Sequence, residues 1–130
     1  MNAWPPAVLL TMGQDVMRQI FRGMLRGCGV RSVEIRPSCE DALALLQDPS
    51  RRWDVLVLDG GLPGALETLR AAKEKTGPHL KVILVFSSPT RKEIVEAKAA
   101  GVDDLMIYPV SEAVLEGRLR KLMDMEIVRR

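Results

Sequence analysis

The sequence predicts an α/β domain built on a doubly wound, five-stranded parallel sheet with five helices. Five short apolar runs alternate along the chain with five longer amphipathic segments, an order typical of strands joined by crossover helices. The apolar runs show little polar and apolar alternation, which favours strands covered on both faces. With 130 residues, 47% of them hydrophobic, the chain has room for one domain, which we expect to span residues 1–130.

The first unit begins with the apolar strand Ala7–Thr11. Asp15 follows at a position where its carboxylate is expected to cap a helix. Apolar residues then recur at steps of three and four until Gly27 and Gly29, which are placed to end that helix. The recurring apolar residues are Met17, Phe21, Met24, Leu25 and Cys28.

Two further strand and helix units follow in the same order. A weak strand is expected at Ser32–Arg36, and Ser38 is placed to cap a helix that Pro49 stops. The clearest strand in the sequence is Trp53–Leu58, and the next helix is expected at Leu66–Lys75.

The fourth strand is expected at Lys81–Phe86. Thr90 and Glu93 have the spacing of a capping box, and their helix is expected to end at Gly101. A fifth strand is expected at Leu105–Tyr108. Because each right-handed crossover returns the chain to the same edge of the sheet, we expect parallel strands with helices on both faces.

The two ends of the chain flank this pattern. The last helix is expected to begin at about Ser111. Trp4 stands beside two prolines, so residues 1–5 are expected to form a loose N-terminus. Residues 124–130 either extend the last helix or begin a linker.

Composition excludes several classes of protein. The net charge of +2 does not favour a dedicated nucleic-acid binder, and 4% aromatic residues are too few for a base-stacking platform. Cys28, Cys39 and one histidine cannot supply a four-ligand zinc site, and each cysteine is expected to be a small buried hydrophobe. The apolar stretch at 7–10 is too short for a signal peptide or a membrane span, so we expect no membrane association and a cytoplasmic location.

Three arginines, Arg18, Arg22 and Arg26, recur at every fourth position of the first predicted helix. Such a stripe is typical of a solvated helix face. An acidic partner or a nucleic acid is the other interpretation, and the balanced net charge argues against the nucleic acid.

Ligands of doubly wound sheets gather where the strands end, so the residues that follow each strand are the functional candidates. Asp54, Asp103 and Asp104 are excluded because they precede strands and belong at the opposite edge. The candidates are Met12, Gly13 and Asp15 after the first strand, Asp59 after the third, Phe86, Ser87 and Ser88 after the fourth, and Tyr108 and Pro109 after the fifth.

Four motifs, two of which include strand-end candidates, occur in a specific order and spacing along the chain. They are Asp59 after a hydrophobic third strand, Leu62-Pro63-Gly64 behind it, Ala100-Gly101 before the fifth strand, and Tyr108-Pro109-Val110 after it. In this respect nearly the whole chain resembles the CheY-like receiver domain of bacterial two-component response regulators. The resemblance implies the flavodoxin-like receiver fold, with strand order 2-1-3-4-5.

The resemblance also implies a chemistry in which a histidine kinase transfers a phosphoryl group to Asp59, whose carboxylate is the nucleophile. In that family an acidic pair after the first strand holds Mg²⁺, a hard cation that prefers oxygen ligands. A hydroxyl group after the fourth strand binds a phosphoryl oxygen, and a lysine after the fifth supplies a fixed positive charge.

Most of these helpers are replaced in this sequence. Met12 and Gly13 stand where the family has its acidic pair, and Tyr108 stands in place of the lysine. A phenol with a pKa of about 10 is neutral at pH 7 and cannot replace an ammonium group. Either Phe86 or Ser87 occupies the hydroxyl position, and only Ser87 could act as the hydroxyl helper.

The sequence therefore predicts a stand-alone pseudo-receiver: a protein-interaction module of two-component (phosphorelay) signalling, not an enzyme, with no cofactor expected. Its partner would be a protein, either a histidine kinase or a downstream signalling protein. Asp59 is then either a vestigial strand-end residue, capped by the amides of Gly60 and Gly61, or a residual phosphoacceptor. The alternative is a working phosphoacceptor in which Asp15 and Asp59 hold Mg²⁺ in a non-standard geometry.

Overall fold

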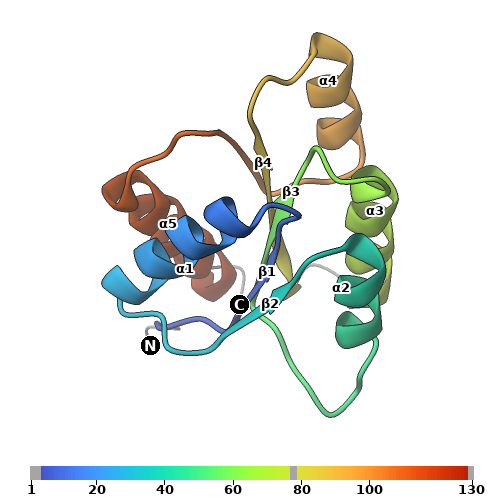
Figure 1. Ribbon diagram of the computed structural model, residues 1–130. Helices are drawn as coiled ribbons and strands as arrows, with labels where there is room; N and C mark the ends of the chain where they lie inside the picture. Colours follow the sequence, from blue (N-terminus) through green and yellow to red (C-terminus); the bar gives the residue numbers. More distant parts are fainter. Residues whose placement is uncertain (1–3, 77–78, 129–130) are drawn as a thin grey trace.

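The computed structural model describes residues 4–76 and 79–128 and has five parallel strands in the order β2-β1-β3-β4-β5 (Figure 1). The predicted fold class is confirmed. The strands are β1 (Val8–Thr11), β2 (Val33–Arg36), β3 (Val55–Asp59), β4 (Lys81–Phe86) and β5 (Asp104–Ile107). The helices are α1 (Asp15–Gly27), α2 (Cys39–Leu46), α3 (Ala65–Thr76), α4 (Arg91–Ala99) and α5 (Glu112–Val128).

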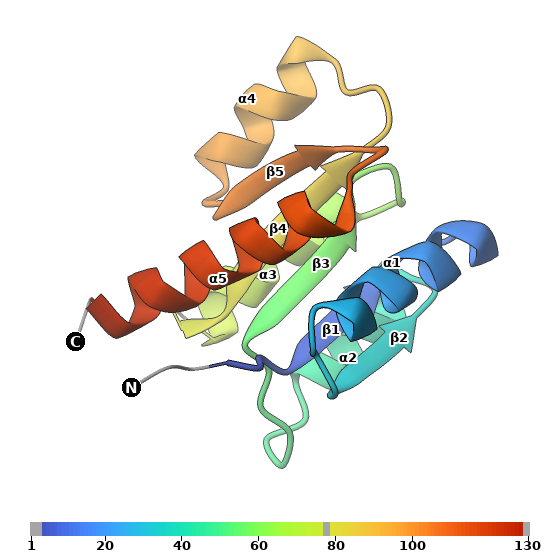
Figure 2. The same ribbon diagram turned by 90° about the vertical axis from the view of Figure 1, so that its left-hand side faces the viewer.

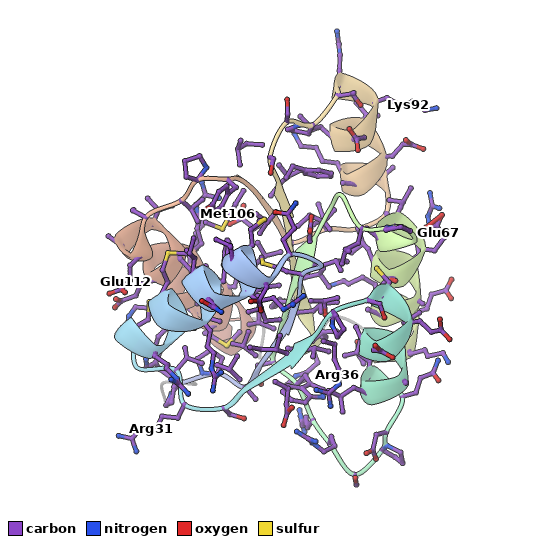
Figure 3. All side chains as sticks on the ribbon, in the orientation of Figure 1. Arg31, Arg36, Glu67, Lys92, Met106 and Glu112 are labelled. Atoms are coloured by element: carbon purple, nitrogen blue, oxygen red, sulfur yellow. The ribbon has the colours of Figure 1, made fainter. Side chains whose placement is uncertain are left out.

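The helices form a layer on each face of the sheet. In Figure 2, α1 and α5 lie in front of the strands, and α2, α3 and α4 cover the other face. Each layer has its own core: Phe21 and Leu115 belong to the first, Leu69 and Ala97 to the second. Figure 3 shows the side chains of both layers, with Met106 of β5 between the sheet and the α1/α5 layer. All strand residues of β1 and β4 are buried, as expected for a sheet covered on both faces.

Local capping signals explain where the helices begin. Ser38 Oγ accepts a hydrogen bond from the Asp41 amide at 3.2 Å, at the start of α2. The capping box of α4 is complete, since Thr90 Oγ1 accepts from the Glu93 amide and Glu93 Oε1 accepts from the Thr90 amide. These two predictions are confirmed.

The predicted cap of α1 is wrong. Gln14 is the N-cap residue and makes no side-chain capping bond, while Asp15 is the first helical residue. The Asp15 carboxylate accepts hydrogen bonds from Arg18 Nη2 at 3.3 Å and Gln19 Nε2 at 3.2 Å. It reaches along the helix, because side chains three and four positions away offer it charged and amide donors.

The N-terminus is more ordered at Trp4 than the sequence suggests. The Trp4 side chain is half-buried against the α1/α5 core, and the Arg120 guanidinium lies 4.0 Å from its ring centroid. This is a cation–π contact, and it corrects the expectation of a loose segment at that residue; residues 1–3 lie outside the described residues. At the other end α5 continues to Val128, and residues 129–130 lie outside the described part.

Both cysteines are buried free thiols, as predicted. Burial, together with the nearby carboxylates of Glu116 and Glu112, raises the pKa of the Cys28 thiol to about 11. Burial also raises the pKa of Cys39. Within the described residues, none of the helices is both long and apolar enough to cross a membrane.

Helix α4 is embedded least in the fold. Of its nine residues only Ala97 is buried, and Val95 is 57% exposed. In Figure 1 it stands apart from the other helices, above α3.

Candidate functional site

Asp59 ends β3 at the carboxyl edge of the sheet, where the sequence placed the site. Its carboxylate is half-buried, and Oδ1 accepts a hydrogen bond from the Gly61 amide at 2.9 Å. The Gly60 amide donates instead to the Val85 carbonyl at 2.8 Å. The predicted capping of Asp59 by its own turn is therefore correct for Gly61 and wrong for Gly60.

The end of β1 carries no acidic side chain. Met12 is completely buried in the α1/α5 core. Gly13 lies so close to Leu62 that a Cβ there would be 2.8 Å from Leu62 Cδ2. Any side chain at position 13 would have to displace Leu62.

Arg18 departs from the solvated stripe that the helical spacing predicts. Its Nη1 donates to the carbonyl oxygens of Met12 at 2.9 Å and of Gly13 at 3.0 Å, while Nη2 faces Asp15. The Arg18 side chain is 22% exposed and that of Asp15 is 72% exposed. A guanidinium group thus holds the carbonyls of the loop that links β1 to α1, whereas Arg22 and Arg26 are exposed, as a solvated face requires.

The residues at this edge do not fit Mg²⁺. Across the described ranges no three His, Cys, Asp or Glu side chains come together in a way that could hold a metal ion. Asp15 is engaged by Arg18 and Gln19. The positive charge of Arg18 at the loop carbonyls also opposes a divalent cation beside them, because like charges repel at short range.

At the end of β4 the structure separates the two candidates for the hydroxyl position. Phe86 is the last strand residue and is buried in the α2/α3/α4 core, where its ring would clash with a Cβ at Gly60. Val85 belongs to the opposite core, in accord with the alternation of side chains along a strand. Ser87 follows, is exposed and makes no side-chain hydrogen bond to any described residue. Ser87 is thus the remaining hydroxyl candidate.

Tyr108 follows β5, and its ring packs into the α1/α5 core. The centroids of the Tyr108 and Phe21 rings are 6.2 Å apart at an interplanar angle of 33°. The Tyr108 amide donates to the Phe86 carbonyl at 2.7 Å, which ties the ends of β4 and β5 together. The side chain at the lysine position therefore contributes packing in place of a positive charge.

Three other carboxylates lie at the opposite edge of the sheet, as predicted, and they have structural partners. Asp54 Oδ2 accepts from the Ala7 amide at 2.8 Å. Asp103 Oδ2 accepts from Lys73 Nζ and from the Val82 amide, both at 2.8 Å. Asp104 pairs with Arg118 at 2.7 Å.

The strand order, the crossover helices and an aspartate at the end of the central strand define a doubly wound receiver-type fold. No family model matches the chain. The chemotaxis protein CheY of Pseudomonas aeruginosa is 29% identical over 120 residues, which is 90% of this chain and 95% of the relative.

Solved structures have the same fold. A CheY-like response regulator receiver domain from Methanospirillum hungatei superposes with a TM-score of 0.87 at 20% identity, covering 95% of this chain and 98% of the other. The receiver domain of a sensor histidine kinase from Pseudomonas aeruginosa, solved with a magnesium ion coordinated in its active site cleft, gives 0.80 at 21% identity, covering 92% and 98%.

The chain is similar to CheY-like response regulator receiver domains in sequence and has their fold. The resemblance stated from the sequence is thereby confirmed. Receiver domains are modules of two-component signalling that interact with histidine kinases and with downstream proteins.

Sequence reasoning missed the role of Arg18. The repeat of arginines at every fourth position indicates a helix face, but it does not say which long side chain turns back over the preceding loop. The position of Arg18 in the first turn of α1 is the only signal in the sequence, because side chains there lie within reach of the loop carbonyls.

Proposed function

We propose that this receiver domain signals by binding a protein partner, and that its site no longer supports efficient phosphorylation of Asp59. The observation that carries the proposal is the hydrogen bonding of Arg18 to the carbonyls of Met12 and Gly13. A cationic side chain holds the loop that would have to supply acidic ligands for Mg²⁺.

Phosphoryl transfer depends on charge stabilisation around the transferred group. The chain offers no acidic pair at Met12 and Gly13, and no ammonium group at Tyr108. Losing these contributions costs several kcal/mol, and since about 1.4 kcal/mol is a factor of ten, we expect phosphorylation to be slower by roughly a thousandfold or more.

An exposed surface of α4, β5 and α5 supports the interaction role. Val95, Ile107 and Val114 are exposed apolar side chains, one on each of these elements. A hollow of about 310 Å³ lies between β5 and α5 and is bordered by Ile107, Val114 and Arg118. Arg118 is already paired with Asp104, so the exposed apolar side chains are the feature that favours a protein partner with an apolar patch.

Treatment with Mg²⁺ and acetyl phosphate, followed by intact-mass measurement, tests the proposal. We expect that neither the wild-type protein nor the Asp59→Asn control gains a stoichiometric phosphate. A stoichiometric mass gain that Asp59→Asn abolishes would refute the proposal. The same assay with a cognate histidine kinase as phosphoryl donor tests whether phosphorylation of Asp59 requires contacts with a protein donor.

A working phosphoacceptor is the second candidate function, and one observation favours it. Only Oδ1 of Asp59 is hydrogen bonded among the described residues, so Oδ2 remains open to a ligand or a phosphoryl group. In this case Ser87 would contact a phosphoryl oxygen, and Asp15 would have to give up its contacts with Arg18 and Gln19 before it could share Mg²⁺ with Asp59. Calorimetric titration with Mg²⁺ separates the two: a binding isotherm lost in Asp59→Asn supports the phosphoacceptor, and a flat titration excludes it.

A further inference from the structure

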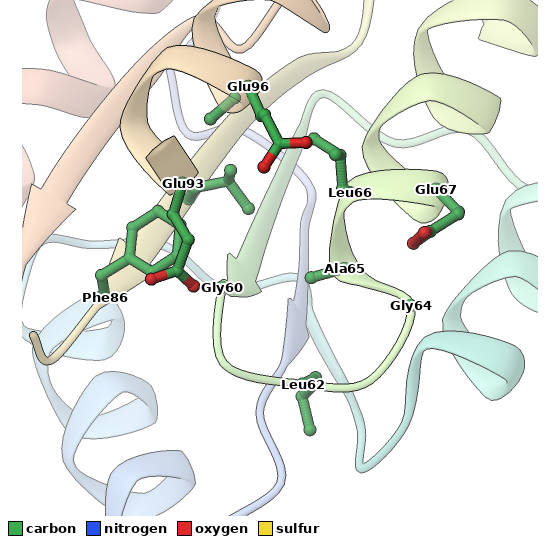
Figure 4. A pocket seen from close by; sticks show the side chains of 11 residues that line it. Gly60, Leu62, Gly64, Ala65, Leu66, Glu67, Phe86, Glu93 and Glu96 are labelled. Atoms are coloured by element: carbon green, nitrogen blue, oxygen red, sulfur yellow. The ribbon is translucent and has the colours of Figure 1, made fainter. Parts of the chain in front are cut away.

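A groove between α3 and α4 lies beside the candidate site and shares Gly60 and Phe86 with it. Its volume is about 240 Å³, and it is bordered by the turn after β3, the first part of α3 and the inner face of α4 (Figure 4). Ala97 is the one buried residue of α4, and it lines the groove together with Glu93 and Glu96 of the same helix.

The floor of the groove is apolar. Leu62, Leu66, Phe86 and Ala97 contribute to it. The Phe86 ring lies directly against Gly60, which has no Cβ to hold it away. The floor therefore continues up to the turn that carries Asp59.

One wall of the groove is acidic. Glu93 and Glu96 are three positions apart on α4 and so share one helix face. Figure 4 shows Glu96 extending toward Leu66 and Glu93 beside the Phe86 ring. Both side chains are half-buried.

Among the described residues, the carboxylates of Glu93 and Glu96 have no basic partner. In the described part of the chain, no Lys, Arg or His nitrogen lies within 4.0 Å of either carboxylate. Glu93 Oε1 accepts a hydrogen bond from the Thr90 amide, and the Glu96 carboxylate makes no hydrogen bond to any described residue. Half-buried carboxylates without a counter-charge are favourably placed to receive a cation, because water screens them only in part.

We propose that this groove binds an arginine side chain of the protein partner. The inference rests on the proposed function, because it assumes a protein partner. An arginine combines an aliphatic stem, which can cover Leu62 and Leu66, with a planar head that can bridge two carboxylates and lie on the Phe86 ring. A lysine offers a point charge without the planar fork, and an apolar side chain would leave the glutamates unpaired.

The test is an NMR titration of the unphosphorylated protein without Mg²⁺. The probe is an acetylated and amidated Gly-Ala-Arg-Ala-Gly peptide, and its control has citrulline, which has nearly the same shape and no charge, in place of arginine. The arginine peptide should shift the amide signals of Gly60, Leu66 and Ala97 to saturation. The citrulline peptide should bind at least about fivefold more weakly.

Two variants that each remove one carboxylate charge, one inside the groove and one outside it, test the role of the glutamates. Glu96→Gln should weaken the arginine peptide at least about threefold, while Glu74→Gln, which removes an exposed carboxylate of α3 outside the groove, should bind like the wild type. Equal affinity for arginine and citrulline, or an unchanged affinity in Glu96→Gln, would overturn the proposal. Phosphorylation of Asp59 in the separate assay would overturn the proposed function alone.

A second copy of the chain is the competing occupant, because α1 presents Arg22 and Arg26 to solvent. NMR spectra of the wild-type protein at decreasing concentration, without peptide, distinguish a second copy of the chain from a partner's arginine as the occupant of the groove. Groove signals that shift with protein concentration, and that stop shifting in Arg22→Ala, would assign the groove to self-association and overturn the partner proposal. Concentration-independent signals support it.

Discussion

The contact of Arg18 with the β1–α1 loop leads to a prediction about stability. In Arg18→Ala the carbonyls of Met12 and Gly13 lose two charge-assisted hydrogen bonds. One is partly buried and the other exposed, so we discount the usual range of about 1.5–3 kcal/mol for a bond to a charged group. We expect a loss of about 2 kcal/mol, equivalent to about 6–10 °C in Tm for a chain of this size.

Two controls isolate this contribution. Arg22→Ala makes the same change of residue type on the same helix, and Arg22 is exposed, so its effect should stay within about 0.5 kcal/mol. Asp15→Ala removes only the contact with Arg18 Nη2 and that with Gln19, and because Asp15 is 72% exposed its effect should also stay below about 0.5 kcal/mol.

Urea unfolding followed by circular dichroism measures all three variants, since small domains usually unfold in a two-state transition. If Arg18→Ala and Arg22→Ala are equally stable, the guanidinium does not fix the loop. The principal argument against Mg²⁺ at this edge of the sheet would then fail with it.

Two further predictions concern the packing at Gly60 and the half-buried ion pair of Lys73 and Asp103. Gly60→Ala should lower the free energy of unfolding by about 1–3 kcal/mol, because the added methyl group would overlap the Phe86 ring. The control Gly23→Ala, in α1, meets no atom within 4 Å and should be neutral or stabilising. A neutral effect of Gly60→Ala in urea unfolding would contradict the close contact. Asp103→Ala should cost about 2–4 kcal/mol, because it leaves the Lys73 ammonium, whose side chain is 19% exposed, without its carboxylate. Thermal unfolding checks this value, and a loss below about 1 kcal/mol would show that water replaces the carboxylate.

Much of the fold could be predicted from the sequence because its signals are local. The strand Lys81–Phe86 was predicted with its observed bounds, and Ser38 and Thr90 cap the helices that were assigned to them. Apolar runs and capping residues act over a few positions, so one segment contains the whole signal. The third strand runs from Val55 to Asp59, one to two residues later than predicted, and Trp53 packs into the core ahead of it.

The site was predicted less completely, because its properties depend on contacts across the fold. The sequence identifies Asp59, Met12 and Tyr108 as strand-end residues, and the structure places them there. It does not reveal that Arg18 would reach back to two carbonyls, or that Tyr108 would turn toward Phe21. The rotamers of long and aromatic side chains are set by their tertiary contacts, which no pattern along the sequence predicts.

The shallow seating of α4 has a consequence for how this protein changes over generations. Ala97 is the only buried residue of the helix, so substitutions at the other positions leave the core intact. Related proteins can therefore differ in the exposed residues of α4 with little change in the free energy of unfolding. Partner choice in such a domain can diverge through α4 while the sheet and the remaining helices stay the same.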